Sequence, residues 1–240
     1  MNLRKTLFAL ALGAAILPAS AAQFDFYKLN QPNSATLDFL PTNGIKCTTH
    51  DLCSSNVDGG VFGGALNFTS DGITASATGS YLGETTRASA VQDSTKNWSD
   101  SNGAGLGVYH QRNVTSDDNI TFGEMLTITF DQAVTVTRIE LRSEGHNFTN
   151  WTSGATFLLN GVQTALPQGT GYIDLNMTGT VFTFAFDGPL PALTNVVKST
   201  GDQFYLSAMT VQAVPEPGTY AMLLAGLGAL GFVARRRAAA

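Results

Sequence analysis

The chain is poor in charge, in histidine and in cysteine, and each scarcity narrows the classes of protein it can represent. Charged residues make up 13% of its 240 residues, with only three histidines and two cysteines. No H-E-x-x-H or G-x-S-x-G motif occurs, so the signatures of a zinc peptidase and of a serine esterase are missing. Cys47 and Cys53 flank His50, but two thiols and one imidazole are an incomplete zinc set. Hydrolysis would therefore need a dispersed triad, in which His110 or His146 meets an acid and a nucleophile.

Basic residues are scarce away from the two ends of the sequence. Without Arg4, Lys5 and the three arginines at 235–237, 8 basic residues face the 18 acidic ones, a net charge near −10. Such a surface disfavours nucleic acid as a partner, because affinity for phosphates depends on clustered Lys and Arg. Calcium or a neutral polysaccharide is compatible with it.

Amphipathic helical patterns of useful length are missing from residues 23–213, which have the composition of strands and turns. Thr, Ser, Asn and Gly are abundant there, together with Phe and Val. Leu126, Ile128 and Phe130 alternate with threonines, which is the period of a half-buried strand. Asn160-Gly161 is typical of a hairpin turn. Strands are expected over residues 65–68, 73–78, 87–91, 106–109, 126–130, 134–141, 156–159, 172–175, 182–186 and 204–211.

These segments predict an all-β domain over residues 23–213, an antiparallel β-sandwich of the jelly-roll kind. A turn is expected at residues 131–132, between two of the strands. Within the strand over 134–141, the valines at the start and the apolar residues at the end have opposite parity. One extra residue would restore the register, so a β-bulge is predicted near Thr137 or Arg138.

Residues 1–22 have the pattern of a cleavable secretory signal peptide. Basic residues precede an apolar core over residues 7–17, and a series of small residues follows it. The core is too short for a membrane anchor and the small residues suit signal peptidase, so cleavage is expected near Ala21 or Ala22. The domain that follows is expected to fold outside the cytoplasm.

The last stretch of the sequence joins three different pieces without a gap. Pro215 and Pro217 fix their own φ angles and push the residues before them towards extended conformations. Residues 214–217 are therefore expected to be a stiff, exposed strip that a peptidase can grip. The uncharged run over 220–234, closed by the arginines at 235–237, predicts a single transmembrane helix with its arginines on the cytoplasmic side.

This order of proline strip, apolar run and terminal arginines resembles the PEP-CTERM sorting signal of bacterial surface and exopolysaccharide-associated proteins. The resemblance implies that a membrane peptidase, exosortase, recognises the strip and cuts near it, releasing or re-attaching the domain. The plain alternative is an ordinary C-terminal anchor behind a proline-bearing linker. The sorting and processing residues implied by the resemblance are Val214, Pro215, Glu216, Pro217, Arg235, Arg236 and Arg237.

Residues 105–141 carry a second, looser resemblance. Their hydrophobic pattern, glycines and acids look like a segment common in the β-sandwich domains of PEP-CTERM proteins, which resemble carbohydrate-binding modules. This resemblance supports the fold and makes sugar binding an alternative function. Trp98 and Trp151 lie in polar loops, where an exposed aromatic ring would stack on sugars. The alternative for each ring is to fold down over an edge of the core.

Two further sites are predicted from short segments. Asp117, Asp118 and Asn119 form the densest cluster of oxygen ligands, which is the chemistry that calcium prefers. Alternatively, these three polar residues form a turn and keep the loop soluble. Cys47 and Cys53 are expected to form a local disulfide, which the oxidising environment of an exported protein favours.

The sequence thus predicts an exported, non-enzymatic bacterial protein with a signal peptide at 1–22, a β-sandwich domain at 23–213 and a sorting tail at 214–240. Its precursor is expected in the cytoplasmic membrane, and its product at the cell surface or in the extracellular matrix. The expected partners are signal peptidase, exosortase and extracellular polysaccharide, with no cofactor apart from calcium. The alternatives are a calcium-dependent carbohydrate-binding module and a secreted hydrolase.

Overall fold

The protein divides into two units, Ala21–Val214 and a second unit that contains Pro215–Ala240. Each unit is considered by itself. The computed structural model describes residues 21–28, 39–43, 45, 52–54, 63–93, 103–110, 118–143, 145–148, 151–187, 203–215 and 217–238.

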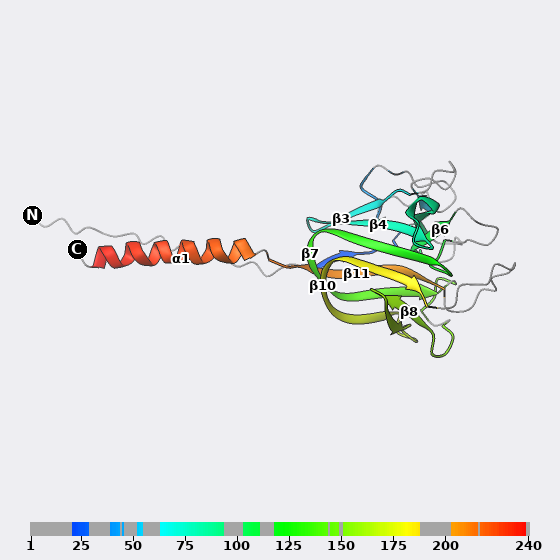
Figure 1. Cartoon of the computed structure of the whole chain (residues 1–240). Helices are drawn as coiled ribbons and strands as arrows, with labels where there is room; N and C mark the ends of the chain where they lie inside the picture. The colour runs from blue at the N-terminus through cyan, green and yellow to red at the C-terminus, as the bar shows by residue number, and fades with distance from the viewer. Residues whose placement is uncertain are drawn as a thin grey trace, which may run out of the picture. The chain divides into compact units, whose positions relative to one another are not determined.

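The first unit is built almost entirely from antiparallel strands (Figure 1). They are β1 (Ala21–Phe24), β2 (Leu52–Ser54), β3 (Leu66–Ser70), β4 (Ile73–Tyr81), β5 (Ala88–Asp93), β6 (Gly105–His110), β7 (Glu124–Ser143), β8 (Thr156–Leu159), β9 (Val162–Ala165), β10 (Tyr172–Phe186) and β11 (Phe204–Ala213). A 3-10 turn at Thr85–Arg87 links β4 to β5. The predicted all-β, antiparallel class is therefore confirmed for the first unit.

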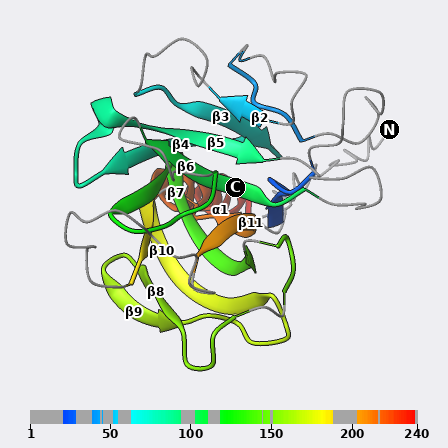
Figure 2. The same ribbon diagram turned by 90° about the vertical axis from the view of Figure 1, so that its right-hand side faces the viewer.

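Hydrogen bonds link these strands into one 11-stranded network. Its main path is β2-β5-β6-β11-β7-β10-β8-β9, with β1 beside β11, β4 beside β7 and β3 beside β4. Figure 2 shows β2 and β9, the two ends of this path, on opposite sides of the domain. Because the path is continuous, the division into two separate jelly-roll sheets stays a prediction.

The long strands β7 and β10 connect the two halves of the network. The first half of β7 pairs with β4 and its second half pairs with β11, while β10 runs beside both halves. Residues 131–133 have no partner in these ladders, and the β7 ribbon curves strongly in Figure 1. The turn expected at residues 131–132 is therefore wrong, because a bend within one strand takes its place. Asp131 Oδ1 stabilises the bend by accepting a hydrogen bond from the Thr74 N–H at 3.1 Å.

The predicted β-bulge is confirmed at Thr137. Arg138 pairs with Thr210 and Val136 pairs with Val211, so Thr137 is the extra residue of β7. Its Oγ1 donates a hydrogen bond to the Thr210 carbonyl at 3.2 Å. The bulge lets apolar residues of opposite parity on its two sides face the same core.

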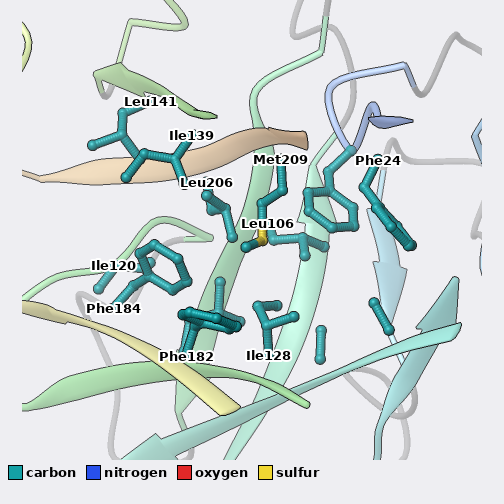
Figure 3. Close-up of a cluster of buried hydrophobic side chains, with 14 of the residues drawn as sticks. Phe24, Leu106, Ile120, Ile128, Ile139, Leu141, Phe182, Phe184, Leu206 and Met209 are labelled. Atoms are coloured by element: carbon teal, nitrogen blue, oxygen red, sulfur yellow. The ribbon is translucent and has the colours of Figure 1, made fainter. Parts of the chain in front are cut away.

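Aromatic and aliphatic side chains from distant strands form the core of the first unit. Figure 3 shows side chains of β1, β6, β7, β10 and β11 gathered in one cluster. Phe130 lies edge-on to Phe24, at 5.7 Å between ring centroids, and edge-on to Phe182 at 5.9 Å. Burying one such ring contributes about 1.5–3 kcal/mol. Phe24 therefore ties the short strand β1 into the core.

The first and last strands of the unit are neighbours. Ala21 lies opposite Gln212, and Phe24 lies opposite Met209. The polypeptide therefore enters and leaves the domain at the same end of the sheet. Thr210 strengthens this pairing, because its Oγ1 donates a 2.6 Å hydrogen bond to a side-chain oxygen of β1.

The described part of the second unit is the helix α1 (Pro217–Ala238), which carries the arginines at 235–237 in its last turn. The transmembrane helix predicted here is not found. Within the ranges given above, no helix is both long and apolar enough to cross a membrane.

Candidate functional site

Two histidine–carboxylate pairs lie in the first unit. His146 Nε2 lies 3.0 Å from Asp93 Oδ2, and both side chains are almost fully buried. His110 Nδ1 lies 2.6 Å from Glu124 Oε1, and the carboxylate of Glu124 is fully buried. The ring of Tyr81 stacks on His110, with centroids 4.0 Å apart and an interplanar angle of 1°. Each of these histidines thus meets an acid, which is one part of the arrangement that a hydrolase would need.

Asp93 belongs to a cluster formed by four separate segments. Asp93 ends β5, His146 follows β7, Asp118 precedes β7, and Tyr205 is the second residue of β11. The Tyr205 hydroxyl donates a 2.7 Å hydrogen bond to Asp118 Oδ1, and its ring lies edge-on to His146. Burial raises the pKa of Asp93 to about 7, against the hydrogen bond from His146, and the nearby Asp118 carboxylate adds to the rise.

The raised pKa of Asp93 predicts that the domain loses stability as pH rises from about 4 to about 7. In that range the folded state holds a proton that the unfolded state has released, so a higher pH favours unfolding. An Asp93→Asn variant cannot ionise there, and we expect its free energy of unfolding to lack this decline. The variant should gain on the wild type by up to about 4 kcal/mol between pH 4 and pH 8. Urea denaturation at several pH values measures the gain.

Asp187 offers a matched control with the opposite sign. Hydrogen bonds from Thr156 and Gln163 lower the pKa of Asp187, so its ionised form stabilises the folded state at neutral pH. Asp187→Asn should therefore cost stability near pH 7 and little at low pH. Parallel pH profiles for the wild type and Asp93→Asn would contradict the assignment of the decline to Asp93.

The predicted calcium ligands are turned towards different partners. Asp118 accepts the hydrogen bond of Tyr205, whereas Asn119 is fully buried and donates to Gln203 Oε1 at 3.0 Å. Asp117 lies outside the described residues. In the described ranges, no three His, Cys, Asp or Glu side chains are grouped to hold a metal ion. The calcium site stays a prediction.

The predicted aromatic and cysteine sites are only partly covered by the structure. Trp151 is 7% exposed and packs in the core, which matches its alternative role at a core edge and leaves no open face for a sugar ring. Cys53 lies in β2 and is fully buried. Trp98, Cys47 and His50 lie outside the described residues, so the disulfide stays a prediction.

Sequence reasoning missed the polar partners of the histidines and of the oxygen-rich loop. Asp93 follows the strand expected at 87–91, and Gln203 precedes the strand expected at 204–211, so both resemble ordinary strand ends. The bond between Asn119 and Gln203 spans 84 residues. A single sequence carries no periodic or motif signal for contacts over that separation.

The sorting strip follows β11 without a linker. The N–H of Val214 donates a 2.9 Å hydrogen bond to the Ala133 carbonyl of β7. Val214 is half-buried, Pro215 is exposed, and α1 begins at Pro217. Glu216 lies outside the described residues. The polypeptide thus passes from the last hydrogen bond of the sheet to the first residue of the helix within three residues.

The chain thus places a β-sheet domain before a proline strip, a helix and an arginine cluster, which is the order of pieces in a C-terminal sorting tail. The family model described as the PEP-CTERM protein-sorting motif matches residues 213–237. The protein therefore carries this motif, which implies a membrane-passing precursor that exosortase processes and that is sorted to the cell surface. No curated protein and no solved structure matches the sequence.

Proposed function

We propose that the β-sheet domain is the part of this protein that functions after export, and that the tail is a sorting signal that is cut off. Exosortase recognises residues 214–217 and cuts beside them. The domain then serves as a non-enzymatic component of the cell envelope or of the extracellular polysaccharide matrix. One observation carries the proposal: the motif match begins at residue 213, which is the last residue of β11, so the sorting signal starts where the sheet ends.

In the first step, signal peptidase removes the signal peptide predicted at residues 1–22 during export. The leader-like composition supports this step, and so does the start of the first unit at Ala21. The cytoplasmic membrane is the place where both peptidases meet the precursor.

The mature protein is expected to begin at Ala22. Ala22 is fully buried opposite Val211, whereas Ala21 is exposed. Cleavage after Ala21 keeps Ala22 in the core, but cleavage after Ala22 removes a buried methyl group and shortens β1. N-terminal sequencing of the exported protein identifies the cut. A mature protein that begins at Gln23 or later would contradict this expectation.

We propose that polysaccharide forms the matrix around the domain and is not a ligand of a defined binding site. The 7% exposure of Trp151 supports this choice, since a buried ring offers little surface for stacking on a sugar. A glycan array, probed with and without calcium, tests the alternative of a carbohydrate-binding module. Specific binding there would replace the matrix role with a recognition role.

Mass spectrometry of the mature C-terminus tests the proposal directly. Cells that contain the sorting peptidase should yield a shortened protein, and cells that lack it should yield the full tail. The proposal fails if the protein ends at Ala240 in both kinds of cell.

A further inference from the structure

The C-terminal end of β11 is held on both sides. Gln212 lies opposite Ala21 of β1 on one side and opposite Thr135 of β7 on the other. The hydrogen bond from the Val214 N–H to the Ala133 carbonyl extends this grip one residue beyond the strand. The polypeptide is therefore part of the sheet up to the residue that begins the sorting strip.

A peptidase binds its substrate as an extended segment on both sides of the bond that it cuts, so residues paired in a sheet must first be released. A cut before Pro215 would require residues 210–213 to leave both neighbouring strands. Val211 would then lose its place in the core, where it is 0% exposed. The domain therefore resists a cut on this side of the strip.

The first turn of α1, on the C-terminal side of the strip, unwinds more readily than the end of β11 leaves the sheet. α1 begins with Pro217 and Gly218, and no acidic residue stabilises its first turn. The first N–H groups of a helix have no partner within the helix, and glycine favours its unwound state. Releasing this turn breaks no strand pairing of β11.

We infer that the fold sets the upstream limit of cutting, so that exosortase cuts on the C-terminal side of Pro217. Two of the three bonds within the strip lead into a proline and are tertiary amides. The third, after Pro215, lies one residue beyond the last sheet hydrogen bond at Val214, so the bond after Pro217 is the first secondary amide on the helix side of the strip. In the cut, the carbonyl carbon–nitrogen bond breaks, and water supplies the new carboxylate oxygen and the proton of the leaving amine. The product keeps all of β11 and ends with residues 214–217. This inference rests on the proposed function.

The same geometry makes β1 a clamp, by which we mean that its pairing holds the end of β11 in the sheet and out of reach of the peptidase. β1 pairs with the last residues of β11, and Phe24 anchors it in the core. Loosening β1 should let the end of β11 enter the peptidase, so that cuts also appear upstream of Val214. The position of the cut then depends on a strand at the opposite end of the sequence.

Intact-mass spectrometry of the exported full-length protein tests the upstream limit. We expect one C-terminus at Pro217 or later in the helix. A folded product that ends anywhere before Pro217 overturns the inference, while the proposed function survives because cutting has occurred. A product that ends at Ala240 with and without the peptidase overturns both.

A pair of core variants tests the clamp. Phe24→Ala weakens β1, and Phe184→Ala removes an equally buried ring from β10, away from the β1 ladder. We expect the fraction cut upstream of Val214 to rise at least about tenfold in Phe24→Ala only, because cleavage follows the population of the open state. A rise in both variants, or in neither, overturns the role of β1. Gln23→Ala, which removes the bond from Thr210 and a bond to Asp25 but no core ring, replaces Phe24→Ala if that variant does not fold.

Discussion

A Gly107→Ala variant is expected to lose at least about 3 kcal/mol of stability or to leave the domain unfolded. A Cβ atom at Gly107 would lie 1.7 Å from the carbonyl oxygen of Asp118. Moving the two segments apart to make room would break the 3.2 Å hydrogen bond that the N–H of the adjacent Val108 donates to the Asn119 carbonyl. The clash is between two backbone segments, so no side-chain rotation relieves it.

Gly179→Ala is the matched control for this substitution. Gly179 also lies in a strand, β10, but the nearest atom to its added Cβ belongs to the side chain of Phe182, at an ordinary contact distance of 3.5 Å. Its replacement should change stability by less than about 1 kcal/mol. Urea denaturation followed by circular dichroism compares the two variants. Equal losses would show that the close approach at Gly107 is not the cause.

Replacing the sorting strip is expected to abolish processing without harming the fold. A triple variant with Pro215→Ala, Glu216→Ala and Pro217→Ala removes the stiff, extended strip that the peptidase grips. We expect the processed fraction to fall at least about tenfold, since a flexible segment binds with a greater loss of conformational entropy. The domain should unfold at an unchanged urea concentration, because the changes follow the last sheet hydrogen bond, at Val214.

Asp174→Ala provides the control for the sorting experiment. Asp174 is an exposed acid on β10 that pairs with Arg138, so its loss changes charge without touching the strip. This variant should be processed like the wild type. Intact mass after expression in cells with the peptidase measures both variants, and normal processing of the triple variant would show that the strip is not the recognised element.

Hydrophobic alternation located the long and regular strands, and turn chemistry located one hairpin. Asn160 and Gly161 both have positive φ angles, 50° and 76°, as the hairpin between β8 and β9 requires. The parity change within β7 was enough to predict its bulge. The strands β1 and β2 were not predicted, because four and three residues show too little of a period and, unlike the equally short β8, neither adjoins an Asn-Gly turn. In β1, moreover, Ala21 and Ala22 have the composition of a leader peptide.

The polar interior shows where reasoning from a single sequence stops. The pair of His146 and Asp93 forms only because β5 and the segment after β7 meet in the folded domain. Neither residue stands in a motif, and each looks like a loop or strand-end residue of a soluble surface. The sorting tail is the opposite case, because its function lies in a contiguous stretch that needs no tertiary contacts to be recognised.

The arrangement of β1, β11 and β7 also determines how the domain responds to mechanical force. A pull at Pro215 that runs along the axis of β11 would act at right angles to the hydrogen bonds between β11 and its neighbours. Those bonds are loaded in shear and must give way together, unlike the one-by-one opening of a strand peeled from an edge. A domain tethered by this end can therefore bear tension without unravelling from the tether.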